Sequence, residues 1–158
     1  MNNGEQFFNT AAGGYSISRS LRFNSSDSAY LSRTAGSPTS SGTWTFSVWI
    51  KRSTLGADTA IIGGRTGGTA SQIYFKSDNT LRWFENGADF STTAVFRDVS
   101  SWYHFVFTKS GSTSCTIYVN GVQVQSGTNN QSFNLNGTYG NFAVGRDSYD
   151  NTRWFSGS

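Results

Sequence analysis

The chain has 158 residues, the size of one ordinary domain, and this length suffices to bury a hydrophobic core without a disulfide or a metal ion. Its single cysteine cannot form an internal disulfide, and its polar, Gly-rich first residues predict no secretory leader. No apolar run approaches the length of a membrane-spanning helix. The formal net charge is +3, but the Lys and Arg residues are scattered. We therefore expect neither a nucleic-acid partner nor membrane insertion.

Composition favours an all-β protein. Charged residues make up 13% of the chain and aromatic residues 16%, while helix formers such as Ala, Glu, Lys and Leu are sparse. We expect residues 1–14 to form a flexible arm and residues 15–158 to form one β domain. Short alternating or aromatic runs bounded by turn residues predict its strands. In chain order these runs are 20–23, 29–32, 44–52, 59–63, 71–76, 80–85, 93–97, 102–109, 116–120, 122–126, 142–146 and 153–155.

The sharpest local signal is the pair Asn120 and Gly121, which separates two apolar runs. Both residue types tolerate positive φ, so the pair predicts a two-residue type I′ hairpin turn. About a dozen short strands with regular turns are typical of a two-sheet antiparallel sandwich or jelly roll.

The only histidine and the only cysteine, His104 and Cys115, fall on neighbouring predicted strands. A reactive pair would need hydrogen-bond contact and an orienting third group, and a strand is not where thiolates are usually activated. We interpret Cys115 as a small apolar core residue and His104 as a core histidine bonded to backbone. On this interpretation Cys115→Ala leaves function intact, and His104→Ala lowers stability by about 1–3 kcal/mol.

Glycoside hydrolysis needs two carboxylates on opposite sides of the scissile bond. The chain has two glutamates, Glu5 in the arm and Glu85 at a strand end. Glu85 and Asp89 are four residues apart, but Asn86 and Gly87 form a turn between them, so the two acids lose a shared strand face. We expect no catalytic residue and no enzyme activity.

Acidic residues gather in one late loop. Asp147, Asp150 and Asn151 offer the oxygen ligands that Ca²⁺ prefers, although such residues also cap turns. We expect no cofactor, with calcium at this loop as the alternative.

The aromatic residues, namely five Trp, seven Tyr and thirteen Phe, exceed what a sandwich core of this size must hold. Surplus aromatic side chains with polar neighbours can form a flat platform on which a sugar ring stacks. The alternative is that they cover the edge of the sandwich. The candidate ligand-binding residues are Trp83, Asp89, Asp147, Tyr149, Asp150, Asn151 and Trp154.

Several stretches together are similar to one known family. They read SLRFNSSDSAYLSRT, WTFSVWIKR, WYHFVFTKSG, TIYVNGVQV, FAVGR and RWFSG. From about residue 15 onward the chain resembles the laminin-G-like, concanavalin-A-like jelly-roll domain found in bacteriophage virion and tail-associated proteins. The resemblance implies a two-sheet antiparallel β-sandwich, with Trp102 and His104 as scaffold positions and Asn120 and Gly121 as a turn.

In the resembled family a closing strand follows the last motif, and this sequence ends at WFSGS. We therefore expect residues 20–23 to lie beside an unpaired slot, filled either by a longer polypeptide or by a strand from a neighbouring subunit.

The resemblance implies a non-enzymatic virion protein of a tail fibre, tail tip or capsid surface, made in the bacterial cytoplasm. Its expected partners are other virion proteins through residues 1–14, further copies of itself and host cell-surface glycans. The alternatives are a carbohydrate-binding module of a non-virion or secreted protein and, third, a glycoside hydrolase.

Overall fold

The computed structural model describes residues 19–34, 36, 40, 42–66, 69–111, 113–131, 142–148 and 151–158. The expected arm at residues 1–14 lies outside these ranges. No helix within them is long and apolar enough to span a membrane. The elements are η1 (Ser25–Asp27), β1 (Leu31–Arg33), β2 (Trp44–Ile50), β3 (Thr59–Thr66), β4 (Thr69–Phe75), β5 (Thr80–Glu85), β6 (Ala88–Val95), β7 (Tyr103–Ser110), β8 (Ser114–Val119), β9 (Val122–Thr128) and β10 (Phe142–Val144).

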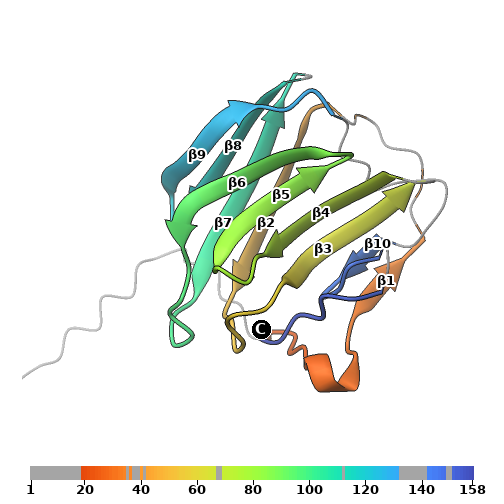
Figure 1. The fold of residues 1–158 in the computed structure, drawn as a ribbon, viewed down its shortest axis with the longest axis vertical. Helices are drawn as coiled ribbons and strands as arrows, with labels where there is room; N and C mark the ends of the chain where they lie inside the picture. The colour runs from red at the N-terminus through yellow and green to blue at the C-terminus, as the bar shows by residue number, and fades with distance from the viewer. Residues whose placement is uncertain are drawn as a thin grey trace, which may run out of the picture.

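Two antiparallel sheets pack face to face (Figure 1). The six-stranded sheet has the order β1-β10-β3-β4-β5-β6, and the four-stranded sheet has the order β2-β7-β8-β9. The predicted all-β sandwich is therefore confirmed.

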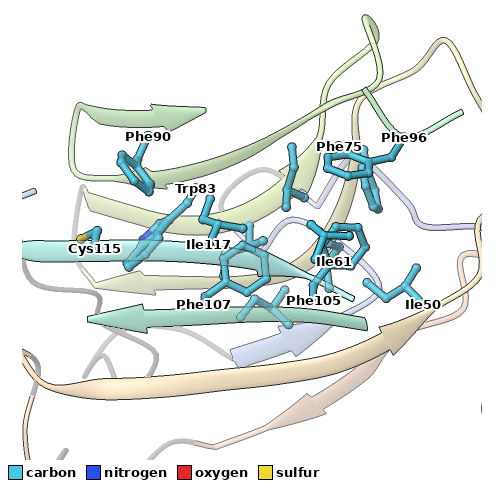
Figure 2. Close-up of a cluster of buried hydrophobic side chains, with 14 of the residues drawn as sticks. Ile50, Ile61, Phe75, Trp83, Phe90, Phe96, Phe105, Phe107, Cys115 and Ile117 are labelled. Carbon is cyan, nitrogen blue, oxygen red and sulfur yellow. The ribbon is translucent and has the colours of Figure 1, made fainter. Parts of the chain in front are cut away.

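The core lies between the sheets and is rich in aromatic rings (Figure 2). Phe105 and Phe107 of β7 point inward and are fully buried, as alternation along the strand requires. Phe105 packs edge-on against Phe75 of β4, with ring centroids 5.7 Å apart, so the two sheets meet through aromatic contacts.

The predicted turn between β8 and β9 is present. Asn120 has φ 50° and Gly121 has φ 81°, the left-handed values that a type I′ turn needs. Asn120 also holds the neighbouring strand, because its Oδ1 accepts from the His104 backbone N–H (2.8 Å) and its own N–H donates to the His104 carbonyl (2.8 Å). This turn therefore fixes where β7 lies relative to the β8–β9 hairpin.

The unpaired slot expected beside residues 20–23 is occupied at Phe23. Gly157 forms antiparallel bridges to Phe23 on one side and to Arg52 on the other. Hydrogen bonds between Phe23 and Gly157 (2.8 and 3.1 Å) complete the first of these bridges. The last residues of the chain therefore join the start of the described chain to the end of β2.

Candidate functional site

Trp83 does not belong to a binding platform. Its side chain points inward from β5 and is fully buried, and its ring lies 4.7 Å from that of Trp44 and 5.8 Å from that of Phe90 (centroid distances). A ring enclosed on all sides offers no face to a ligand, so the sequence prediction for Trp83 is wrong. Alternation along β5 pairs Trp83 with Leu81 and Glu85 on the inner side.

The two predicted aspartates have different surroundings. Asp89 is partly exposed, but its carboxylate pairs with Arg82 (2.7 Å) and accepts from Ser91 Oγ (2.6 Å). Asp147 is fully buried, and its carboxylate accepts from Gln72 Nε2 (2.6 Å) and pairs with Arg153. Asp147 is therefore a structural anion, and its prediction as a ligand-contacting residue is corrected.

The remaining predicted residues lie on the C-terminal segment. Tyr149 and Asp150 fall outside the described residues. Asn151 is exposed, and Trp154 is half-buried against Tyr30, with ring centroids 5.7 Å apart. Among the residues that the structure describes, no group of three or more His, Cys, Asp or Glu side chains could hold a metal ion.

Asp147 and Asp89 belong to a network on the outer surface of the six-stranded sheet, which we call the closed face. Its residues are Gln72 and Tyr74 of β4, Arg82 and Phe84 of β5, Asp89 of β6, and residues 146–148 and 153, which pack on the β3–β4 part of this face.

Tyr74 lies at the centre of the closed face and is only 3% exposed. The guanidinium carbons of Arg82 and Arg153 lie 5.5 and 5.1 Å from its ring centroid, and Arg82 donates to its hydroxyl. Nearby, a Cβ on Gly63 would lie only 3.0 Å from the backbone N of Ser148. The chain thus packs directly on this face and satisfies its charges internally.

A second ion pair crosses the core between the sheets. Lys109 of β7 and Glu85 of β5 are both fully buried, with Nζ and Oε2 3.0 Å apart. Burial raises the pKa of Glu85, while Lys109 opposes this shift. Burial likewise raises the pKa of the Cys115 thiol, which favours the unreactive protonated form and agrees with the core role expected for that residue.

The outer surface of the four-stranded sheet, which we call the open face, has a different composition. Strand pairing arranges its outward side chains in four rows that cross the strands. The rows are Ser110–Ser114–Thr128, then Thr45–Thr108–Thr116–Ser126, then Ser47–Val106–Tyr118–Gln123, and finally Trp49–His104. Hydroxyl side chains make up the first two rows, the third is mixed, and aromatic rings make the fourth.

The aromatic row contains the most exposed ring system of this face. Trp49 is 52% exposed, and its indole stacks on the imidazole of His104 with centroids 4.7 Å apart and planes 13° apart. Ser47 Oγ is hydrogen-bonded to His104 Nε2 at 2.9 Å. Trp102, two residues before His104, is 41% exposed. The open face therefore presents an indole braced by an imidazole, with the Ser47 hydroxyl beside the imidazole and the hydroxyl-bearing rows beyond it.

This arrangement corrects the interpretation of His104 as a core residue. His104 points outward, because its neighbours Tyr103 and Phe105 face the core. Sequence analysis did not select Trp49 as a binding residue, although a signal existed. In 44–50 Trp49 alternates with Thr45 and Ser47, on the side opposite Phe46 and Val48. A tryptophan among polar positions of an alternating strand indicates an exposed ring.

The sandwich, its strand order and its aromatic core define a concanavalin-A-like class of protein. Residues 23–158 match the family Laminin_G_3, described as the Concanavalin A-like lectin/glucanases superfamily, and the chain belongs to this family. The resemblance stated from the motifs is confirmed at this level. No curated protein sequence was found to match the chain at a significant level.

Solved structures with the same fold come from several sources. A candidate carbohydrate-binding protein of Bacteroides ovatus is 21% identical, with a TM-score of 0.65 over 81% of this chain and 38% of that one. Domain 4 of AbnA, an extracellular arabinanase of Geobacillus stearothermophilus solved with arabinotriose, is 23% identical, with a TM-score of 0.59 over 75% of this chain and 58% of that one.

Domains LG4-5 of the mouse laminin alpha1 chain are 15% identical, with a TM-score of 0.58 over 82% of this chain and 36% of that one. The chain thus spans less than two thirds of each of these proteins. At such identities the likeness concerns the fold.

Proposed function

We propose that this protein is a non-catalytic carbohydrate-binding module that binds sugar on the open face. The observation that carries the proposal is the half-exposed indole of Trp49, braced by His104 at the end of a hydroxyl-rich sheet surface. Sugar rings combine apolar faces with peripheral hydroxyl groups, so an aromatic plane beside hydroxyl donors and acceptors suits them. The names of two structural neighbours, a candidate carbohydrate-binding protein and a domain solved with arabinotriose, support this reading.

The surroundings of the acids favour binding over hydrolysis. Glu85 is enclosed in the core and paired with Lys109, so it cannot reach a glycosidic oxygen at the surface. Asp147 is likewise buried and paired with Arg153. Among the described residues of the open face, the four rows contain no carboxylate. A retaining or inverting glycosidase needs two carboxyl groups beside the bound sugar.

The setting that we propose for this binding is a bacteriophage virion. It is carried by the motif resemblance, which also implies docking through residues 1–14, a homo-oligomer and host cell-surface glycans as ligands. Immunogold labelling of intact particles tests it: particle-bound label supports the virion setting, and unlabelled particles overturn it. If the protein is instead a module of a non-virion or secreted protein, it should bind sugar while intact particles remain unlabelled.

A pair of variants tests the binding site. Trp49→Ala removes the stacking plane, and Val122→Ala is its control, because Val122 is also an apolar side chain of this sheet and is 66% exposed. A glycan array first identifies a ligand, and isothermal titration calorimetry then measures the dissociation constant. We expect Trp49→Ala to weaken binding at least tenfold and Val122→Ala to change it less than twofold. Equal affinity of Trp49→Ala and the unmodified protein would remove the open face as the site.

A further inference from the structure

We infer that the open face selects uncharged glycans, in spite of the positive net charge of the protein; this inference rests on the proposed sugar-binding function. The net charge of +3 would by itself favour acidic polysaccharides, because a positive protein attracts anions over long distances. The distribution of charges on the two outer faces leads to the opposite expectation.

The described rows of the open face carry no Asp, Glu, Lys or Arg side chain. They present serine and threonine hydroxyls, the Tyr118 ring, the Gln123 amide and the Trp49–His104 stack. The nearest cationic residue is Lys51, which follows the end of β2 and lies on the same side of the chain as Trp49, so its substitution is part of the test below. A ligand lying across the rows would therefore meet dipoles and rings.

Hydroxyl and amide groups donate and accept hydrogen bonds, as the hydroxyl groups of a neutral sugar do. A sugar carboxylate or sulfate would instead lose hydration on these rows, whose own side chains supply no cationic partner. Removing a charge from water without pairing it costs more free energy than removing a hydroxyl group that finds a hydrogen-bond partner. The chemistry of the face thus discriminates against anionic sugars.

The arginines of the closed face do not compensate, because Arg82 and Arg153 already have carboxylate partners and Arg146 is buried against the ring of Tyr30. Arg82 pairs with Asp89 at 2.7 Å, and Arg153 pairs with the buried Asp147 and lies 3.6 Å from Asp58. An anionic glycan would have to displace these intramolecular carboxylates. We therefore expect acidic sugars to bind the closed face weakly.

Two panels of soluble polysaccharide test the inference. The neutral panel contains arabinan, mannan and dextran, and the acidic panel contains polygalacturonate, hyaluronate and heparin. Binding is measured by affinity electrophoresis and calorimetry at low and at high NaCl concentration. We expect at least one neutral polymer to bind with less than a twofold change in affinity between the salts, since contacts between neutral groups are not screened. Lys51→Gln and Arg82→Gln should bind it as the unmodified protein does, and Trp49→Ala should lose at least tenfold.

The experiment separates failure of the selectivity from failure of the proposed sugar-binding function. Binding confined to acidic polymers, weakened by salt and by Lys51→Gln or Arg82→Gln, would overturn the inferred selectivity while sugar binding itself stands. Failure of both panels and of the glycan array would overturn the proposed function, and the selectivity with it.

Discussion

The two outer faces of this sandwich differ in how far other parts of the chain cover their outward side chains. On the closed face, residues 146–148 and 153 pack against Gln72 and Tyr74, which are 4% and 3% exposed, and the more exposed Arg82 and Asp89 pair with each other. On the open face, the alternate positions carry small hydroxyl side chains and one half-exposed tryptophan. The inward positions of both sheets are mostly apolar and closely packed, with the buried pair of Glu85 and Lys109 as the charged exception. Core packing thus constrains the inward side chains of each strand, while the outward side chains can either pack under other residues or contact a ligand.

The difference concerns charge as well as cover. The closed face contains several charges. Arg82 and Arg153 each have an acid within 4 Å, and Arg146 is buried with its guanidinium 3.7 Å from the ring centroid of Tyr30, so all three are engaged within the protein. The four rows of the open face contain no charged Asp, Glu, Lys or Arg side chain. We expect substitutions on the closed face to affect stability, and substitutions on the open face to affect binding.

The largest effect should come from the pair that links the two sheets. Lys109→Met leaves Glu85 buried without its cation, which costs about 3–5 kcal/mol of unfolding free energy in such pairs. Because burial raises the pKa of Glu85, protonation relieves the variant, and its deficit relative to the unmodified protein should be smaller at pH 4 than at pH 7. Urea unfolding at both pH values measures this.

The double variant Lys109→Met with Glu85→Leu is the control, because it removes both charges and should recover most of the loss. A single variant as stable as the unmodified protein would contradict a buried pair at this site.

On the closed face, Asp147→Asn keeps the shape of the side chain and removes its charge. Arg153 and Gln72 then lose a charged acceptor, and we expect a loss of about 2 kcal/mol in urea unfolding. Glycan affinity should stay within twofold of the unmodified value. If binding fell and stability did not, Asp147 would belong to a ligand site after all.

On the open face, His104→Ala should cost less than about 1 kcal/mol, because its hydrogen bond to Ser47 is exposed and its backbone bonds to Asn120 persist. Its neighbour Phe105 points into the core and supplies the contrast, since Phe105→Ala should cost about 3–5 kcal/mol. Thermal and urea unfolding of both variants test this. Similar losses in the two would show that His104 is a packing residue.

The smallest effect concerns the loop that precedes Trp102. Hydrogen bonds from Ser100 and Ser101 lower the pKa of Asp98 from 3.8 to about 2. The stabilisation is therefore complete above about pH 4 and is lost as the pH falls toward 2. Asp98→Asn should flatten this part of the stability profile slightly, as measured by urea midpoints between pH 2 and 5. An unchanged profile would contradict these hydrogen bonds.

Local patterns in the sequence predicted much of the fold. The Asn120–Gly121 turn was predictable because Asn and Gly tolerate positive φ by themselves, without help from residues distant in the chain. The two sides of β7 follow from alternation, but which side is the core depends on comparing Tyr103, Phe105 and Phe107 with the more polar opposite side.

The candidate site was harder to predict, because it depends on partners distant in the chain. Nothing near Asp147 in the sequence indicates that Gln72, 75 positions earlier, buries its carboxylate. Alternation along β5 places Glu85 inward with Leu81 and Trp83, but no local pattern contains its partner there, Lys109 of the other sheet. Trp83 was misassigned because its polar neighbours suggested exposure, although strand alternation places it with Leu81.

The bonds that join Asn120 to the backbone of His104 have a practical consequence for protein engineering. They hold the β7 backbone without using the His104 side chain, and the inward residues of the same strands supply the packing. The outward positions can therefore be randomised as a combinatorial library while the scaffold is kept constant. The four-stranded sheet thus offers a surface on which new recognition specificities can be selected.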